Sequence, residues 1–507
     1  MKKKLTILLE NLTGFQVYGS LGRNISGITD DSRNVEKGDL FVAISGLNID
    51  AHKFIPVAIA SGAQAIVGEK EPRREWLNDI AYIKVPNSRK ALSLFASAWY
   101  AHPSKKLKIV GVTGTDGKTT TSHLIYWILK KSGEKAGLIS TISAKIGDRQ
   151  YDTGFHVTNP EPLQLQKFLA KMVEKKCKYA VLEVTSHGLD QERVTGVDFD
   201  VAVLTNITHE HLDYHKTWLD YLNAKAKLFK KVKTAVLNKD DIVVYEDIKC
   251  VVPTSALVVS YGIEEEGVDY YGENIKTKKQ GTEFDIVFAN RRYSIKTKLF
   301  GDYNVSNILA ASAVAREFKI PWIKIQSATL LFKSPVGRLE EIKNNRGFKI
   351  YVDFAHTPNS LEKVLNMLSG QTKEKLIAVF GCAGERDVAK REQMGEISGR
   401  LADVSVFTAE DPRSEDVNGI ISEMAKGAKK SGAKEAKSGQ RSFVRVPERG
   451  DAISYAIQKL ARKGDIIVVC GKGHEKSMAY DGIEYSWNDQ AAVKIALDGG
   501  TKRIKRE

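Results

Sequence analysis

The sequence has 507 residues, more than one hydrophobic core usually organises, so we expect several domains and predict three. Hydrophobic residues make up 42% and charged residues 27%, which is typical of a folded globular protein and excludes a fibrous or largely disordered chain. The formal net charge is +15, yet the lysines are scattered and are not interleaved with aromatic residues as a nucleic-acid stacking surface requires. We therefore expect no nucleic-acid partner and consider a substrate with several negative charges instead.

No stretch of the sequence approaches the roughly 20 apolar residues that a membrane span needs, and the apolar run near the start ends at Glu10. This pattern predicts a cytoplasmic protein with no membrane insertion. The four cysteines, Cys177, Cys250, Cys382 and Cys470, are widely spaced and form no CxxC pair. We therefore expect reduced thiols and neither a disulfide framework nor a zinc site.

Residues 1–104 are predicted to form a small α/β domain. Short strand-like segments occur at 39–45, 63–69 and 80–85, and a helix-like stretch follows at 88–100. The polar sequence HPSKK then interrupts the pattern, which indicates a boundary between domains.

Residues 105–334 are predicted to form a second α/β domain with a parallel sheet. Its first strand, LKIVGVTG from Leu107, runs into a glycine loop and then into a helix that Gly133 ends. Further apolar runs end in polar residues, as buried parallel strands do, and ligands gather at the carboxyl ends of such strands. These runs are YAVLEVTS (179–186), DVAVLTNI (200–207) and TAVLNKDD (234–241).

Residues 335–507 are predicted to form a third, Rossmann-like α/β domain. Strand-like runs separated by helix-forming segments each end in polar or charged residues, so the active edge of this domain should face the central one. The lysine-rich stretch 426–441 is expected to be a solvated helix or loop, and the sequence shows no internal repeat. The runs are KIYVDFAH (349–356), LIAVFGCAGERD (376–387), VSVFTAEDPRSE (404–415) and DIIVVCGKGHE (465–475).

The strongest local signal is a glycine loop between a strand and a helix, the setting of a nucleotide triphosphate loop. Its glycines let backbone N–H groups close on phosphate oxygens, Lys118 would reach the β- and γ-phosphates, and the Thr119 hydroxyl would bind magnesium. The loop departs from the usual GxxxxGK[ST] spacing, because Val112 stands where the first glycine belongs. The predicted ATP-binding residues of the loop are Gly114, Thr115, Asp116, Gly117, Lys118, Thr119 and Thr120.

A family resemblance narrows the many activities that such a loop supports. The sequence GTDGKT resembles the GTxGKT loop of the Mur ligases and of the related folylpolyglutamate synthases, and further segments resemble Mur ligase motifs in the same order. The resemblance implies a catalytic magnesium site that uses Thr119, Glu183, His211 and a carbamylated Lys225. Lys227 lies two residues further along, where a helix would point it to another face.

Three histidines within seven residues, His209, His211 and His215, would also be compatible with zinc. No cysteine accompanies them and carboxylates dominate nearby, so a hard cation is the better interpretation. We therefore expect ATP and Mg²⁺ as the cofactors.

Further nucleotide contacts are implied by the same resemblance. They lie in the motifs GDYNVSN, GRLE and DFAHTP. Considered without the resemblance, the two asparagines before a helix would be interpreted first as helix caps. The residues are Asn304, Asn307, Arg338, Asp353 and His356.

The resemblance also assigns the first domain and part of the second to binding of a UDP-linked muramoyl peptide. In the N-terminal domain, Asp31-Ser32-Arg33 and the segment 38–43 resemble the UDP-holding module of the family, with Ser32 as a contact. Thr185 replaces the serine that is usual in the family and keeps its hydroxyl. The implied contacts in the central domain are Thr158, Asn159, Thr185, Gln191 and Arg193.

The last motifs resemble those of the branch that adds a diamino acid as the third residue of the peptide. Arg386 and Arg413 match two arginines that grip the distal carboxylate of meso-diaminopimelate, a task that suits the planar guanidinium, and Gly471 and Glu475 match contacts to its distal end. The family motif usually reads Asp-Asn-Pro-Arg, whereas here it reads Glu410-Asp411-Pro412-Arg413. The acidic Asp411 in place of asparagine would favour the bare ammonium of lysine. Because an unpaired buried arginine is costly, we expect diaminopimelate and keep lysine as the alternative.

The resemblance thus implies an ATP-dependent amide-bond-forming ligase, expected to act as a monomer, whose substrates are a UDP-linked muramoyl dipeptide and a diamino acid. A carboxylate of the precursor would attack the γ-phosphate to give an acyl phosphate, from which the amine then displaces phosphate. A folylpolyglutamate synthase is the nearest rival, but it lacks the UDP-type domain that residues 31–43 resemble. A P-loop ATPase without ligase activity is the rival from another class, since the loop alone indicates only phosphate handling.

Overall fold

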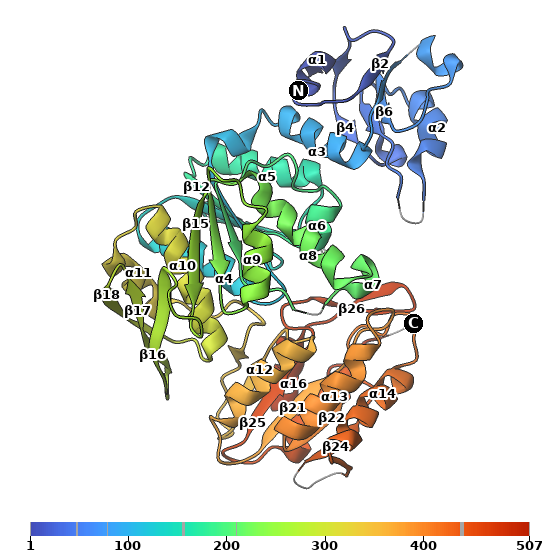
Figure 1. Ribbon diagram of the computed structural model, residues 1–507. Coiled ribbons are helices and arrows are strands. Elements are labelled where there is room, and N and C mark those ends of the chain that lie inside the picture. Colours follow the sequence, from blue (N-terminus) through green and yellow to red (C-terminus); the bar gives the residue numbers. More distant parts are fainter. Residues whose placement is uncertain are drawn as a thin grey trace.

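The computed structural model shows three α/β units that follow one another along the chain (Figure 1). Each unit is built on its own sheet, of five, eleven and seven strands respectively. The described residues are 2–46, 49–78, 80–154, 158–208, 210–436 and 441–505.

The N-terminal unit confirms the predicted strands and helix. Its sheet has the order β2 (Gln16–Tyr18), β7 (Ala81–Lys84), β6 (Ala65–Gly68), β5 (Leu40–Val42) and β4 (Ile28–Thr29), with β4 to β7 parallel and β2 antiparallel to β7. Helix α3 (Ser88–Trp99) begins where the Asn87 side chain accepts a hydrogen bond from the Lys90 amide, as N-caps do. Its apolar face packs against β5 and β6, while α2 (Ile55–Ala60) covers the opposite face of the sheet.

The central unit contains the predicted parallel strands in the middle of a larger sheet. The order is β11 (Arg149–Tyr151), β10 (Ala144–Ile146), β9 (Ala136–Ile139), β12 (Tyr179–Glu183), β8 (Lys108–Thr113), β13 (Val201–Leu204), β14 (Thr234–Asn238), β15 (Leu257–Gly262), β16 (Tyr270–Lys278), β17 (Gly281–Phe288) and β18 (Arg291–Thr297). Strands β9, β12, β8, β13, β14, β15 and β16 run parallel. Antiparallel pairing occurs at both edges, between β9, β10 and β11 at one edge and between β16, β17 and β18 at the other, and neither antiparallel edge was predicted from the sequence. Charged residues interrupt these edge strands, so they lack the continuous apolar runs of buried strands.

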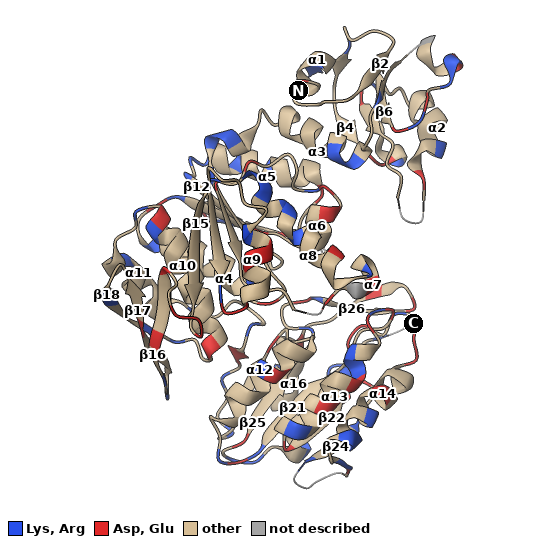
Figure 2. Ribbon diagram, in the orientation of Figure 1, with Lys and Arg blue, Asp and Glu red and all other residues tan. Residues whose placement is uncertain are grey.

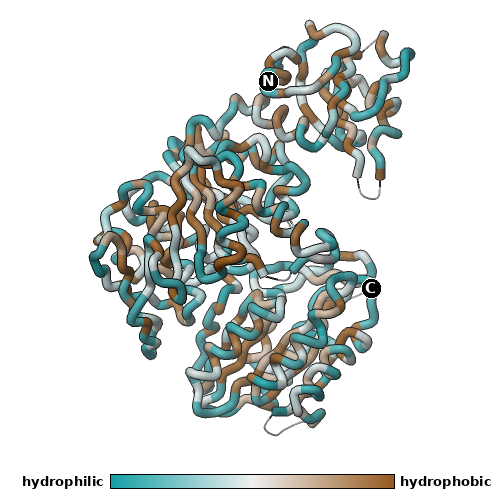
Figure 3. Tube along the Cα trace, in the orientation of Figure 1, coloured by the Kyte–Doolittle hydropathy of each residue, from teal (hydrophilic) through white to brown (hydrophobic). Residues whose placement is uncertain are grey.

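Helices cover both faces of the central sheet, which explains why its middle strands are apolar throughout (Figure 3). On one face lie α4 (Lys118–Lys131), α10 (Asp302–Glu317) and α11 (Trp322–Leu331). On the other lie α5 (Pro162–Glu174), α8 (Trp218–Ala226) and α9 (Ile242–Lys249).

The C-terminal unit has a seven-stranded sheet that contains the four predicted strands. Its order is β19 (Glu340–Glu341), β20 (Lys349–Val352), β25 (Ile466–Val469), β21 (Leu376–Phe380), β22 (Val404–Phe407), β24 (Ser442–Arg445) and β23 (Lys434–Glu435), all parallel except β19. One face is covered by α12 (Pro358–Ser369), α13 (Ala389–Leu401) and α14 (Val417–Lys430), the other by α15 (Arg449–Tyr455) and α16 (Asp489–Leu497). The lysine-rich stretch 426–441 thus begins inside α14, and residues 437–440 of it lie outside the described part.

Charged residues occur in all three units, with Lys and Arg interspersed among acidic residues (Figure 2). Among the helices of the described residues, none is long and apolar enough to cross a membrane.

A buried ion pair fixes the ends of two C-terminal strands. Arg449 and Asp489 are both fully buried, and the guanidinium donates to both carboxylate oxygens at 2.8 and 2.7 Å. The same guanidinium donates to the carbonyl oxygens of Ala409 and Cys470, which follow β22 and β25. The pair therefore sets the position of the two loops that leave these strands.

We expect Arg449→Ala to destabilise the C-terminal unit by about 3–5 kcal/mol, because it leaves the Asp489 carboxylate buried without its cation. Denaturant unfolding, with hydrogen exchange of β22 and β25, measures the effect. The matched control is Arg503→Ala, which removes an exposed pair with Asp451 and should change stability by no more than about 1 kcal/mol. Equal losses in the two variants would contradict this account.

Candidate active site

The glycine loop lies at the carboxyl end of β8 and leads into α4. Gly114 and Gly117 have positive φ angles of 148° and 83°, which favour glycine. A side chain at Gly114 would also collide with the Thr205 hydroxyl. The Lys118 ammonium donates to the carbonyl oxygens of Gly114 and Thr115 at 3.0 and 2.6 Å, so it lies folded over the loop at the start of α4. This is the arrangement that a phosphate-binding loop requires.

Three predicted residues from three separate segments meet beside this loop. The Thr119 hydroxyl donates to Oε1 of Glu183 at 2.9 Å and accepts a hydrogen bond from Nη2 of Arg338 at 2.9 Å. Glu183 is buried at the end of β12, and its Oε2 accepts from the Thr141 amide at 3.1 Å. Arg338 comes from the C-terminal unit, so this cluster joins two domains.

Lys225 and Lys227 have different environments. Lys225 is 1% exposed, and its ammonium nitrogen donates to the carbonyl of Gly114 at 2.6 Å. Burial and the nearby Lys118 charge hold the pKa of Lys225 well below its usual value. Lys227 instead pairs with Asp190 at the surface, 3.0 Å away. Only Lys225 therefore lies among the predicted catalytic groups.

Glu210, to which the sequence analysis assigned no role, links His211 to the C-terminal unit. Its carboxylate lies 3.7 Å from Nε2 of His211 and 2.9 Å from Nε2 of His356. Burial alone would raise the pKa of Glu210, but His211 and the bonded His356 lower it well below the usual range. Burial lowers the pKa of His211 to about 4, so this imidazole is neutral near neutral pH.

The described residues contain no group of three or more His, Cys, Asp or Glu side chains arranged to hold a metal ion by themselves. His209, one of the three histidines considered for zinc, lies outside the described residues. The oxygen and nitrogen donors beside the glycine loop come instead from Thr119, Glu183 and His211.

The asparagines of α10 do not cap the helix, so that interpretation was wrong. The N-cap position is Gly301, and both side chains are buried within the first two turns. Asn307 accepts a hydrogen bond from the Thr121 hydroxyl at 3.0 Å and donates to Oδ1 of Asn304 at 3.1 Å. A side chain at Gly117 would approach Oδ1 of Asn307 to 2.5 Å, so α10 packs directly against the glycine loop.

Two further predicted nucleotide residues, Asp116 and Asp353, form hydrogen bonds near the boundary between the central and C-terminal domains. Asp116 accepts a hydrogen bond at Oδ2 from Nδ2 of Asn359, 2.7 Å away across the domain boundary. Asp353 accepts from the amides of Leu339 and Ala355 at 2.6 and 2.7 Å, which shapes the turn that carries Arg338. The role of Asn359 was not predicted, because nothing in its local motif reveals a partner 243 residues away.

The predicted precursor contacts of the central domain adjoin Glu183. Asn159 donates to the backbone carbonyl of Glu183 at 2.8 Å and accepts from both the amide and the hydroxyl of Thr185 at 2.9 Å. Arg193 donates to the carbonyl of Asn159 at 2.9 Å. Thr158 contacts the Thr141 hydroxyl at 2.9 Å. These residues therefore form one hydrogen-bonded network with the magnesium candidate.

Two predicted precursor contacts lie apart from this network. Gln191 donates to the hydroxyl of Tyr214 at 3.3 Å. Ser32 lies in the N-terminal unit, in a turn that begins where Asp31 accepts a hydrogen bond from the Arg33 amide. Within the described residues, Ser32 makes no hydrogen bond to the central residues above, so its assignment to the same substrate rests on the family resemblance.

The predicted amino-acid contacts lie on the loops after β21, β22 and β25. Arg386 reaches across to the central domain, where its guanidinium lies 2.8 Å from Asp213 of α7 (Leu212–His215). Arg413 has a φ of 55° and its amide donates to the carbonyl of Ala479 in β26 (Ser477–Tyr480). Gly471 also has a positive φ, 107°.

The environment of Asp411 corrects the expectation that its charge faces a substrate ammonium. Asp411 is 8% exposed, and both carboxylate oxygens accept from the ammonium of Lys472 at 2.8 Å. Lys472 is fully buried and also lies 2.5 Å from Glu475. Lys472 thus balances the extra negative charge of the aspartate inside the protein. The sequence pattern did not reveal this partner.

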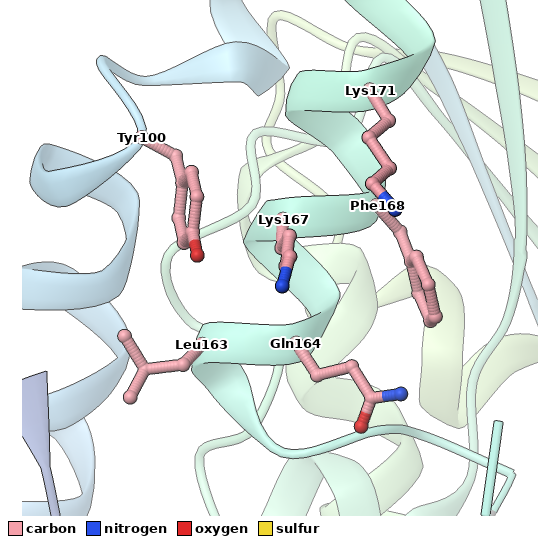
Figure 4. A pocket seen from close by; sticks show the side chains of 6 residues that line it. All are labelled: Tyr100, Leu163, Gln164, Lys167, Phe168 and Lys171. Atoms are coloured by element: carbon pink, nitrogen blue, oxygen red, sulfur yellow. The ribbon is translucent and has the colours of Figure 1, made fainter.

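A cavity of about 50 Å³ adjoins these loops and is lined from the central domain by Thr141 and Asp152 and from the C-terminal domain by His474 and Glu475. It therefore brings Glu475 opposite the residues beside Glu183. A larger groove of about 380 Å³ lies between the end of α3 and α5, where Tyr100 and Lys167 line it, and none of the predicted site residues does (Figure 4).

Comparisons with known proteins agree with this geometry. Family models described as the Mur ligase catalytic domain, the Mur ligase middle domain and the Mur ligase glutamate ligase domain match residues 24–100, 112–315 and 337–473. A protein of Geobacillus thermodenitrificans named UDP-N-acetylmuramoyl-L-alanyl-D-glutamate–2,6-diaminopimelate ligase is 39% identical, over 97% of this chain and 99% of its own. This chain belongs to the Mur ligase family.

Solved structures show the same architecture. A structure of a ligase with that same name covers 98% of this chain and 99% of its own, with a TM-score of 0.67 and 28% identity. The MurF ligase of Thermotoga maritima, solved in complex with ADP, covers 93% of this chain and 97% of its own with a TM-score of 0.60; at 20% identity it supports the fold alone. The three-domain α/β fold and the activity of an ATP-dependent amide-bond-forming ligase are confirmed.

Lys118→Ala is expected to abolish ATP-dependent turnover and to leave the fold intact, because the ammonium contacts only loop carbonyls and lies outside the apolar core. Phosphate release and circular dichroism measure the two effects. The control is Lys131→Ala at the other end of α4, which should keep normal turnover. A folded Lys118→Ala variant with near-normal turnover would refute the role of this residue.

Proposed function

We propose that this ligase joins meso-diaminopimelate to UDP-N-acetylmuramoyl-L-alanyl-D-glutamate, the reaction that its relatives are named for. The observation that carries the proposal is that the predicted amino-acid residues reach the domain that holds the glycine loop. Arg386 contacts Asp213 of the central domain, and Glu475 lines a cavity with Thr141, whose amide binds Glu183.

The first step is the attack of the D-glutamate carboxylate on the γ-phosphate of ATP. Lys118 supplies positive charge to the phosphates once it exchanges its two loop carbonyls for phosphate oxygens. Asn159, Thr185 and Arg193 hold the muramoyl peptide beside Glu183, so the carboxylate meets the γ-phosphate in a fixed orientation. The carboxylate oxygen forms a bond to the γ-phosphorus and the bond between the γ-phosphorus and ADP breaks, so the products are an acyl phosphate and ADP.

Magnesium fits the groups beside the loop. The Thr119 hydroxyl and the Glu183 carboxylate are oxygen donors 2.9 Å apart, and neutral His211 is close enough to Lys118 and Lys225 for their charges to lower its pKa. A carbamate on Lys225 would add a further anionic oxygen, and its low pKa favours the neutral amine that captures carbon dioxide. When bound, the ion supplies charge neutralisation for the phosphate oxygens.

The second step is the attack of the diamino acid on the acyl phosphate, with release of phosphate. Arg386 and Arg413 present guanidinium groups that match a distal carboxylate in bidentate fashion. The interdomain contacts of Arg338, Asn359 and His356 hold the two edges together, which keeps water from the acyl phosphate.

Domain boundaries at 104/105 and 334/335 are proposed from the sequence pattern. They are supported by the strand pairing, since among the described strands none pairs across either position. The N-terminal domain, with Ser32, is proposed to hold the UDP group, and a cytoplasmic location and a monomeric state stay predictions.

The test of the proposed function is phosphate release from ATP with the UDP-linked dipeptide and either meso-diaminopimelate or L-lysine. We expect diaminopimelate to be preferred, and Arg413→Ala to lower kcat/KM for it by about 10²-fold or more, because each charge-assisted hydrogen bond contributes roughly 1.5–3 kcal/mol. The use of lysine should change far less. A wild-type preference for lysine with an unchanged ratio in Arg413→Ala would overturn this specificity while leaving the ligase activity in place.

Lys225→Ala is expected to remove nearly all activity, because it removes the group that carries the proposed carbamate. Short carboxylic acids should restore part of it by replacing the lost anion. Lys227→Ala, which only breaks a surface ion pair, is the matched control and should stay close to the wild type. Carbon-13 spectroscopy with labelled bicarbonate reports the carbamate directly, and its absence from active wild-type enzyme would rule out this modification.

A further inference from the structure

Glu410 is a buried carboxylate at the first position of the segment Glu410-Asp411-Pro412-Arg413, and the mechanism above gives it no role. It lies three residues after β22, at the carboxyl edge of the C-terminal sheet, and is 6% exposed. Its Oε2 is buried and has no hydrogen-bond partner among the described residues. Leaving such a group unsatisfied costs about 1–3 kcal/mol or more, so its retention calls for a function.

The residues around Glu410 fix the position of its backbone, but none of the described residues forms a hydrogen bond with Oε2 of its carboxylate. Arg449 binds the carbonyls of Ala409 and Cys470, which fixes the backbone on both sides of the carboxylate. Gly471 lies beside it, and a side chain there would come within 3.4 Å of Oε2. The absence of that side chain leaves space next to the free oxygen. The titratable and charged groups that face Glu410 are Lys390, His356, Asp411, Lys472, Arg449, Cys382 and Cys470.

The groups around Glu410 belong to both halves of the proposed reaction. His356, which binds Glu210 beside the proposed magnesium ligand His211, is close enough to act electrostatically on the Glu410 carboxylate. Asp411 acts on it in the same way, and Gly471 lies against its side chain; both belong to the amino-acid motifs. Glu410 is therefore close both to the amino-acid motifs and to the histidine that reaches the proposed magnesium site.

This position matters because an amino acid arrives as an ammonium, which has no lone pair for attack. The other ionisable groups nearby are less suited to take its proton. Asp411 and Glu475 are both bound to Lys472. Burial lowers the pKa of His474 to about 3, which makes it a weak base. Among the described residues, Glu410 has a buried carboxylate oxygen with no hydrogen-bond partner.

We propose that Glu410 is the catalytic base of the amide-forming step, and that it binds the reacting ammonium of the diamino acid and accepts one proton from it. This inference rests on the proposed function. The Glu410 carboxylate becomes a carboxylic acid as the ammonium becomes an amine. The amine nitrogen then forms the C–N bond, the C–O bond to phosphate breaks, and the second amine proton leaves with the phosphate.

Burial raises the pKa of Glu410 above its usual value, which brings it closer to the working pH of a general base. The carboxylate must be ionised to accept a proton. Amide formation should therefore fall as the pH falls through this raised pKa, and should level off above it.

The test separates acyl-phosphate formation from amine transfer in the full-length enzyme. Glu410→Gln keeps the size of the side chain and removes the base, so transfer to diaminopimelate should fall by about 10²-fold or more. Isotope exchange between the bridging and non-bridging oxygens of ATP should be retained, because it reports only the first step. Trapping by hydroxylamine, a nucleophile that is largely unprotonated near neutral pH, should stay within about threefold of the wild type.

Two further variants and a pH series complete the design. Glu410→Asp keeps a carboxylate and should recover at least part of the lost transfer. Glu396→Gln, on the exposed side of α13, is the matched control and should behave as the wild type. Raising the pH should restore transfer in Glu410→Gln continuously, since more of the free diamino acid is then unprotonated, without the levelling expected of the wild type.

Equal losses of transfer and of hydroxylamine trapping in Glu410→Gln would overturn the base assignment in favour of a structural role, and so would an unchanged rate of transfer. Failure of the proposed function looks different. In that case the wild-type enzyme itself would form no acyl phosphate from the UDP-linked dipeptide, or would form it and pass it to no diamino acid.

Discussion

The hydrogen bond from Arg338 to the Thr119 hydroxyl is the contact on which the candidate active site depends, because it joins the C-terminal domain to the first turn of α4, directly after the glycine loop. Two further contacts, Asn359 to Asp116 and His356 to Glu210, cross the same boundary. Together they place the carboxyl edge of one parallel sheet opposite that of another. Ligands of open α/β sheets bind at such edges, and here two edges share one ligand-binding space.

Buried ionisable groups are the second constraint, and they fall into two classes: those paired with an opposite charge and those without such a partner. Arg449 with Asp489, and Lys472 with Asp411 and Glu475, are fully paired, so they hold loops at fixed positions. Lys225 is buried with its ammonium on the Gly114 carbonyl oxygen and near the Tyr221 ring, and burial holds its pKa low. Oε2 of Glu410 has no hydrogen-bond partner among the described residues. Unpaired groups of this kind are frequent at sites of chemistry, where a ligand supplies the missing partner.

Local sequence patterns predicted the strands that matter most. Strands β8, β12, β13, β21, β22 and β25 are continuous apolar runs that end in polar residues, so both their burial and the location of the site at their carboxyl ends could be predicted. The antiparallel edge of β16 to β18 was missed because one of its faces is exposed and charged. The asparagines of α10 were interpreted as caps when considered alone, because burial against the glycine loop is not a local property.

The sequence by itself determined the family, the three α/β units and the residue types of the glycine loop, since spacing within a loop dictates which groups a strand end can present. Only the tertiary structure decided which partners those residues have. Lys472 neutralises Asp411 although the two lie 61 residues apart, and Glu210 binds His356 across 146 residues. The free oxygen of Glu410 likewise follows from how loops of separate strands pack together. The charge state of a buried group follows from what lies within a few ångströms of it, and the order of residues along a chain does not contain that distance.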